Sequence, residues 1–301
     1  MRSHEGTMTA EDTPKGFALG LTAYLLWGFL PLYMKAVAHI PAAEIIAHRV
    51  LWSIPVAAAV LIWLGRTGDL KTALRSPRTV AMAALTAALI SVNWGIYVWA
   101  IASGHALEAA LGYYINPLFS VFLGAVLLGE RLRPLQWIAI ALAGAAVLVL
   151  TIENGTIPYA SLSLTVTWGF YAYFKKSLPV GPNQGFLLEI LLLAPAALAY
   201  VVWLEATGAG HFLAGHAPDM WLILGLGLVT AGPLMIYGNA AKLLRLSTIG
   251  IMQYIAPTMI LLLAVFLFGE PFGTARAIAF PMIWAALALY TWSMVRARRA
   301  A

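Results

Sequence analysis

Long apolar runs follow one another along almost the whole chain, separated by short polar stretches. We expect ten membrane-spanning helices, at about residues 17–38, 44–64, 79–101, 107–128, 134–151, 157–176, 183–205, 218–239, 246–268 and 273–295. Each run is close to the ~20 residues that a helix needs to cross the hydrocarbon core of a bilayer. Because irregular backbone cannot face lipid, the pattern predicts an all-α membrane protein.

Composition supports the same class. Of the 301 residues, 62% are hydrophobic and 10% are charged, and the mean hydropathy is +0.86. A typical soluble protein has roughly 25% charged residues, so no soluble domain of useful size is expected. The net charge of +6 does not predict a nucleic-acid partner, because the basic residues lie at the ends of the apolar runs and form no stripe.

Several kinds of chemistry are excluded by missing residues and motifs. The chain has no cysteine, which rules out disulfides, thiolate metal sites and haem attachment. Its six histidines are scattered, and we find no Gly-rich phosphate loop, no GxSxG motif and no HExxH motif. The sequence therefore predicts no metal site, no cofactor and no ATP-driven pumping by this chain alone.

Lysine and arginine fall in alternate loops. With the N-terminus inside, every cytoplasmic segment contains Lys or Arg, and the external loops between the runs contain neither. Positive residues mark the cytoplasmic side of a membrane protein. We therefore expect both termini in the cytoplasm, with residues 1–16 as an N-terminal tail and residues 296–301 as a basic C-terminal tail.

The chain also repeats itself. A shift of 140 residues places Pro117 on Pro257, and a shift of 141 places Trp27 on Trp168. The predicted repeats are residues 17–151 and 157–295, with five helices each. Because the first helix runs outward and its partner, the sixth, runs inward, the two repeats have opposite topology. Inverted repeats are typical of secondary transporters, whose substrate site lies between the repeats.

The second run carries a dense group of polar side chains inside the membrane, where each needs a reason. Glu44, His48 and Trp52 share one helix face, and Arg49 lies beside His48. One interpretation is a site for an anion or a coupling proton, because histidine changes its charge near neutral pH. The alternative is a structural tie from Arg49 to Glu108 or to a backbone carbonyl, which would only position helices.

Two prolines occupy equivalent points of the fourth and ninth runs. Pro117 and Pro257 each remove a helix hydrogen bond and are expected to bend their helices. Polar and aromatic side chains accompany them: Glu108, Tyr114 and Asn116 in the fourth run, Gln253 and Tyr254 in the ninth. Paired interruptions of corresponding helices predict the substrate site, although membrane helices tolerate proline in general.

Other polar positions admit both a functional and a structural interpretation. Asn93 lies among aromatic residues of the third run, where it would line a pocket or merely bridge two helices, and the aromatics equally fit interfacial belts. Glu189, near the inner end of the seventh run, is a candidate cytoplasmic gate. The pairs Gly129-Glu130 and Gly269-Glu270 are interpreted as structural helix ends.

Ten spans in two groups of five, with Gly-Glu at the ends of the fourth and ninth, resemble the EamA family of the drug/metabolite transporter superfamily. Segments 48–53, 107–118, 128–131 and 245–258 carry motifs of one group of permeases within that family. The resemblance implies a permease of a bacterial inner membrane that exports or exchanges small metabolites or drugs. It covers residues 16–298 and leaves the N-terminal tail outside.

Our hypothesis is a secondary transporter in which the two halves rock around a central cavity. Arg49 or His48 would hold an anionic or carbonyl group, with Glu108 as partner or proton carrier. The substrate would be oriented by Asn93, Asn116, Gln253, Tyr114 and Tyr254. The expected partners are a small organic molecule, the lipid bilayer and protons, and the fifth and tenth helices would serve packing or a homodimer contact.

Two other classes remain open from the sequence. A membrane-embedded enzyme or assembly protein could use His48, Glu44 and Glu108 as acid and base, but such enzymes usually show a motif at the membrane face, and none occurs here. A channel is the third option, although no carbonyl filter or ring-forming signature is present.

Overall fold

The computed structural model describes residues 13–128, 132–213, 217–240, 243–244, 248 and 252–299. In this part of the chain helices are joined by turns and loops, and no strand occurs. The helices are α1 (Pro14–Ala36), α2 (Ala42–Trp63), α3 (Gly68–Leu74), α4 (Pro77–Ala102), α5 (Ala106–Leu128), α6 (Pro134–Asn154), α7 (Tyr159–Lys176), α8 (Pro182–Thr207), α9 (Ala217–Ala240), α11 (Ile255–Leu262), the π-helix η1 (Leu263–Leu267) and α12 (Thr274–Arg299).

Eight of the described helices are long and apolar enough to cross a membrane, which confirms the multi-pass membrane class. They are α1, α2, α4, α5, α6, α8, α9 and α12. The 18-residue α7 coincides with the sixth predicted run. The ninth run corresponds to a shorter apolar stretch, Ile255–Leu267, formed by α11 and η1.

The ninth predicted span is the main difference from the sequence analysis. Residues 246–268 do not form one continuous helix, because Gln253 and Tyr254 form a turn immediately before α11 begins at Ile255. Pro257 is therefore the third residue of α11, where a missing N–H removes no intrahelical bond. The expectation that Pro257 bends a long helix is therefore wrong. Pro117, in contrast, does lie inside α5.

Smaller differences concern helix ends. α1 begins at Pro14, because the Thr13 hydroxyl accepts a hydrogen bond from the Gly16 N–H (3.0 Å) and caps the helix before the predicted start at 17. α12 continues to Arg299 and so includes most of the predicted basic tail. The short helix α3, which was not predicted, lies in the loop between the second and third runs.

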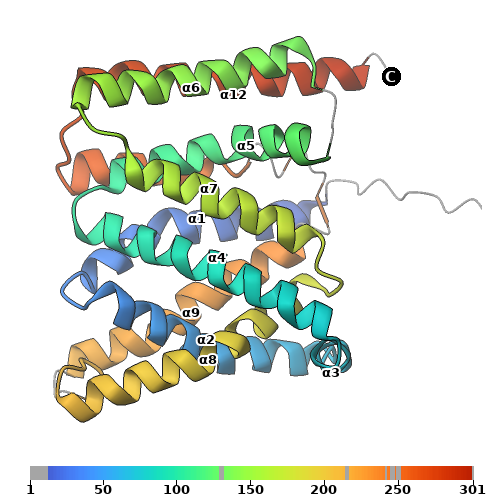
Figure 1. Cartoon of the computed structure of the whole chain (residues 1–301), viewed down its shortest axis with the longest axis vertical. Helices are drawn as coiled ribbons and strands as arrows, with labels where there is room; N and C mark the ends of the chain where they lie inside the picture. The colour runs from blue at the N-terminus through green and yellow to red at the C-terminus, as the bar shows by residue number, and fades with distance from the viewer. Residues whose placement is uncertain are drawn as a thin grey trace, which may run out of the picture.

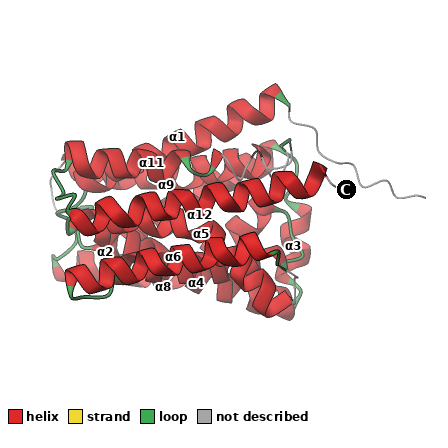
Figure 2. Ribbon diagram, turned by 90° about the horizontal axis from the view of Figure 1, so that it is seen from above, coloured by secondary structure: helices red, strands yellow, loops and turns green. Residues whose placement is uncertain are grey.

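The helices run roughly side by side in one bundle (Figure 1). α1 begins and α12 ends at the same end of the bundle, which we call the tail end, and α1 ends and α12 begins at the opposite end, which we call the far end (Figures 1 and 2). α6 packs against α12 at one edge of the molecule, and α2 packs against α8 and α9 at the other. Between these edges α1 contacts α9 and α11, and α7 contacts α4 and α5.

Glycines allow some of these helices to approach closely. A Cβ atom on Gly227 would overlap the backbone carbonyl of Trp52 where α9 crosses α2. On Gly28 it would lie 2.8 Å from the Cβ atom of Met259, and on Gly169 it would lie 2.5 Å from the ring of Phe119. Small residues at helix crossings are a common device for close packing in membranes.

Candidate functional site

A cavity of about 530 Å³ lies in the centre of the bundle, within the usual size of small-molecule sites. Its walls come from α1, α2, α4 and α5 of the first half of the chain and from α7, α8, α9, α11 and the turn before α11 of the second half. The polar lining residues are Arg49, Asn93, Asn116, Ser120, Lys175, Asn183, Thr230 and Gln253. The aromatic lining residues are Tyr24, Trp27, Trp94, Tyr97, Tyr113, Trp168, Tyr171, Phe186 and Tyr237.

Arg49 is the charged residue at mid-bundle in this lining. It lies about two turns from the start of α2 at Ala42, and it is 3% exposed. Its Nε donates to the hydroxyl of Thr230 on α9 (3.0 Å), and its guanidinium carbon lies 4.6 Å from the ring centre of Trp94. Its Nη1 has no partner among the described residues. Since a guanidinium is always charged, the cavity wall carries a fixed positive charge at this point.

Three more buried oxygen atoms in the lining lack a hydrogen-bond partner within the described part of the chain: Asn93 Oδ1, Asn116 Oδ1 and the hydroxyl of Tyr97. The amide of Asn93 is oriented by its nitrogen, which donates to the Leu164 carbonyl (3.1 Å) and to the Thr167 hydroxyl (2.9 Å) on α7. Buried polar atoms are normally satisfied. This group of atoms is therefore suited to a ligand or to water.

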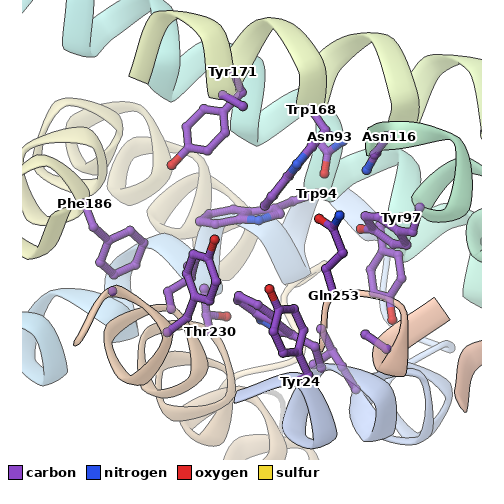
Figure 3. A pocket seen from close by; sticks show the side chains of 18 of the residues that line it. Tyr24, Asn93, Trp94, Tyr97, Asn116, Trp168, Tyr171, Phe186, Thr230 and Gln253 are labelled. Carbon is purple, nitrogen blue, oxygen red and sulfur yellow. The ribbon is translucent and has the colours of Figure 1, made fainter. Parts of the chain in front are cut away.

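Aromatic rings form most of the remaining wall (Figure 3). Tyr24, Trp27 and Tyr237 contact one another, with ring centres 5.4 to 5.8 Å apart. Trp94 extends across the cavity from α4, while Gln253 points up from the opposite side toward Asn93 (Figure 3). Aromatic walls favour flat or amphipathic molecules.

Three residues of the α2 cluster, Glu44, His48 and Trp52, lie outside this lining. His48 is 1% exposed, its Nδ1 accepts a hydrogen bond from Trp52 Nε1 (3.2 Å), and its ring packs on Phe212. Glu44, which is fully buried, binds His211 at the far end through the backbone N–H (2.7 Å) and Nδ1 (2.8 Å). These contacts join α2 to the segment between α8 and α9.

The predicted tie between Arg49 and Glu108 is wrong. Glu108 Oε2 accepts a hydrogen bond from the backbone N–H of Ala160 (3.2 Å), in the first turn of α7. No described carboxylate comes within 4.0 Å of the Arg49 guanidinium. The reason is electrostatic, because a carboxylate is stabilised beside the free N–H groups and positive dipole of a helix N-terminus. His48, Arg49 and Glu108 thus form no single acid–base cluster.

Tyr114 and Tyr254 also lie outside the central cavity. Their rings stack with centres 6.3 Å apart, and the Tyr114 hydroxyl is 2.6 Å from the Thr258 hydroxyl. Together with Trp284 and Trp292 of α12 they line a separate, largely apolar groove. Of the predicted site residues, the central lining contains Arg49, Asn93, Asn116, Gln253 and Pro257, but not His48, Trp52, Glu108, Tyr114, Tyr254, Pro117 or Glu189.

Glu189 lies about two turns inside α8 from its start at the tail end, next to the cavity. Its Oε1 accepts hydrogen bonds from Lys175 Nζ (2.6 Å) and from the Thr86 hydroxyl (2.7 Å), and its Oε2 lies 3.4 Å from the Tyr171 hydroxyl. Lys175 and Tyr171 are themselves lining residues. The sequence marks Lys175 only as one of the basic residues on the cytoplasmic side, and it does not predict this pair.

Glu270 was also read only as part of a helix end. Gly269 has a φ of +68°, the left-handed conformation expected there. The carboxylate of Glu270 accepts hydrogen bonds from the backbone N–H groups of Ala106 (2.6 Å) and Leu107 (3.0 Å) and so caps α5 from another part of the chain. Within the described residues, no three His, Asp or Glu side chains form a metal-binding group.

Comparison with known proteins identifies the family of this chain. The EamA-like transporter family matches residues 14–152. Protein RarD of Streptomyces exfoliatus is 42% identical over 293 residues, covering 97% of this chain and 93% of that protein. The chain belongs to the EamA-like transporter family. Protein RarD of Escherichia coli is 38% identical to this chain over 292 residues, covering 97% of this chain and 99% of that protein.

Further relatives agree. An uncharacterized transporter of Pseudomonas aeruginosa is 41% identical over 97% of this chain and 98% of its own length, and the chloramphenicol-sensitive protein RarD of the same organism is 34% identical over 95% and 96%. A solved structure described only as a crystal structure of a protein matches with a TM-score of 0.59 at 24% identity, covering 93% of this chain and 98% of that one, which supports the fold alone. This EamA protein is therefore a RarD-type membrane transporter, and the prediction of a transporter instead of an enzyme is confirmed.

Proposed function

We propose that this EamA protein is a secondary transporter that moves a small organic molecule across a bacterial inner membrane by alternating access. The central cavity is its binding site. The observation that carries the proposal is that both halves of the chain contribute walls to one buried cavity with unsatisfied polar atoms. Sites of secondary transporters lie at mid-membrane between two repeats.

The cavity supports the inverted repeat, because lining residues occur in equivalent pairs. With offsets of 140 or 141, these pairs are Trp27 and Trp168, Leu30 and Tyr171, Trp94 and Leu234, Tyr97 and Tyr237, Tyr113 and Gln253, Asn116 and Ala256, Ser120 and Ile260. Helix packing follows the same symmetry, since α1 contacts α9 and α11 as α7 contacts α4 and α5. The close contacts Gly28–Met259 and Gly169–Phe119 are also equivalent. We therefore retain ten spans in two five-helix repeats, 17–151 and 157–295.

The two ends of the cavity differ. Its lining runs from mid-bundle to the tail end, where Lys175, Asn183 and Gly238 belong to it. Toward the far end, buried apolar residues such as Met34 and Ile101 fill the bundle. Three carboxylates there bind backbone N–H groups of other segments: Glu44, Glu108 and Glu270. We propose that the chain is in an inward-facing state, with the tail end and both termini in the cytoplasm.

Alternating access is tested with single cysteines, since the native chain has none. Ser120→Cys, in the cavity lining, should react with a membrane-impermeant maleimide from the cytoplasmic side. Met34→Cys, fully buried toward the far end, should react only from the outside and only when the protein turns outward. Thr72→Cys on the exposed α3 is the cytoplasmic control. Labelling of Ser120→Cys from outside alone would reverse the proposed orientation.

Transport itself is tested without knowing the substrate. Metabolites released by cells that overproduce the protein are compared with those of cells that lack it, and each enriched compound is then offered to inside-out vesicles. Uptake that depends on a pH gradient supports proton coupling. If no released compound differs between the two strains and none enters vesicles, the proposed function is wrong.

A further inference from the structure

The charge of the cavity identifies the kind of molecule that it binds. Arg49 is nine-tenths or more buried, and its Nη1 atom lacks a partner among the described residues. A buried cation without a counter-charge is expensive in a membrane protein. The stacking on Trp94 and the bond to Thr230 compensate only part of that cost, because both partners are neutral.

The described buried carboxylates are bound elsewhere and cannot neutralise Arg49. Glu44 binds His211, and Glu270 binds the first turn of α5. Glu189, next to the lining, is paired with the lining residue Lys175, so the charges of these two residues cancel each other. The cavity wall therefore has a net charge of about +1, located on Arg49. A ligand that completes the site has one negative charge.

The neutral polar atoms define a second requirement. Asn93 Oδ1 and Asn116 Oδ1 are hydrogen-bond acceptors without a donor in the described part of the chain. The orientation of Asn93 is fixed by its two bonds to α7, so its free atom is an acceptor and not a donor. A ligand that satisfies these atoms carries an N–H or O–H group apart from its anionic group.

The shape of the remaining wall adds a third requirement. Trp94, Trp168 and Tyr97 come from α4 and α7 and surround the same space (Figure 3). Flat rings contribute contact area and offset stacking that a saturated chain does not reproduce. The positive charge of the wall is on Arg49, and most of the other lining side chains are apolar or aromatic.

We propose that the cavity binds an organic monoanion with a flat aromatic body and at least one hydrogen-bond donor, whose anionic group lies on the guanidinium of Arg49. This inference rests on the proposed function only in taking the cavity as the transport site. It names the substrate class of that site, and it excludes cations and uncharged aromatic compounds as preferred cargo.

The test is a binding series with one body and three head groups. The purified full-length protein is titrated calorimetrically with 3-(4-hydroxyphenyl)propionate, its amide and the corresponding propylammonium ion, all of which share the phenol O–H as donor. 3-Phenylpropionate, which lacks this donor, should bind more weakly than 3-(4-hydroxyphenyl)propionate. The carboxylate should bind at least about tenfold more tightly than the amide, which corresponds to about 1.4 kcal/mol, and the ammonium ion should bind most weakly. 3-Cyclohexylpropionate, the saturated counterpart, should bind more weakly than 3-phenylpropionate.

Arginine variants connect the preference to its residue. Arg49→Gln should remove the difference between carboxylate and amide, and Arg49→Lys should keep it in weaker form. Arg276→Gln, at the start of α12 and outside the cavity lining, is the matched control and should behave as the wild type.

The wild-type series decides the inference even if Arg49→Gln does not fold. Equal binding of the three head groups would overturn it. So would no binding of 3-(4-hydroxyphenyl)propionate at millimolar concentration, or chloride competing as well as the carboxylate. Equal binding of the cyclohexyl compound would overturn the aromatic part. Carboxylate binding without vesicle transport would contradict the proposed function instead and leave this inference intact.

Discussion

Replacing Glu270 by glutamine should destabilise the protein strongly for such a small change. The carboxylate accepts two backbone N–H groups, from Ala106 at 2.6 Å and Leu107 at 3.0 Å, and the residue is 7% exposed. Glutamine keeps one acceptor oxygen but turns an amide N–H₂ toward the second backbone donor. One charge-assisted bond is lost, one buried donor is left unsatisfied, and the attraction to the positive end of α5 disappears.

These losses combine to about 3 kcal/mol, taking typical values for a charge-assisted bond and a helix-terminus charge. For a large domain this lowers the Tm by roughly 6 °C. The assay is thermal unfolding followed by tryptophan fluorescence in one detergent at one scan rate, because unfolding of such proteins is often irreversible. Amide hydrogen exchange at residues 106 and 107 should increase in the same variant.

Glu153→Gln is the matched control, since it is an exposed glutamate near the far end of α6. Exposed substitutions usually change stability by less than about 0.5 kcal/mol, so its Tm should shift by less than about 2 °C. If Glu270→Gln behaves like Glu153→Gln, and exchange at the start of α5 is unchanged, then Glu270 does not hold that helix and the reasoning is wrong.

Two other predictions concern packing and the paired charges. Gly227→Ala should prevent accumulation of a monodisperse protein in size-exclusion chromatography, because the added Cβ atom would overlap the Trp52 carbonyl. Gly232→Ala on the same helix should behave normally in the same assay, because its Cβ atom would meet no atom closer than 4.0 Å. Lys175→Met should lower the Tm more than Lys175→Met combined with Glu189→Gln, because a lone buried carboxylate costs about 3 kcal/mol or more. If the effects of the two single variants on the Tm simply add, the two charges are not coupled.

The transmembrane helices could be predicted from hydropathy because lipid imposes one simple rule on every long apolar run. The interruption at Gln253 and Tyr254 could not, because hydropathy measures the preference of side chains for lipid and says nothing of backbone continuity. The seven-residue α3 is too short to give a periodic signal. Helix ends such as Thr13 and Arg299 depend on caps and on local contacts.

The site was only partly accessible from sequence. Arg49, Asn93 and Asn116 could be chosen because polar residues in a span face the bundle interior. The partner of Glu108 could not be predicted, because it is a backbone N–H of α7 and no side-chain pattern marks it. Trp94, one of the aromatic residues around Asn93, could not be assigned to the cavity, because a tryptophan that lines a cavity and a tryptophan at a membrane interface look the same in the sequence.

The duplicated cavity repeats some of its rings, Trp27 as Trp168 and Tyr97 as Tyr237, but not the charge of Arg49. The position equivalent to Arg49 in the second half is Ile190, and the position equivalent to Asn116 is Ala256. The hydrogen bonds and the ion pair to a substrate therefore come mainly from the first half of the chain. The second half contributes mostly apolar contacts, which have no preferred direction and so allow the substrate to slide. In the proposed cycle the substrate would stay bound to the first repeat while the second repeat moves relative to both. Its strongest bonds need not break and re-form midway, so the occupied transition would have a low barrier.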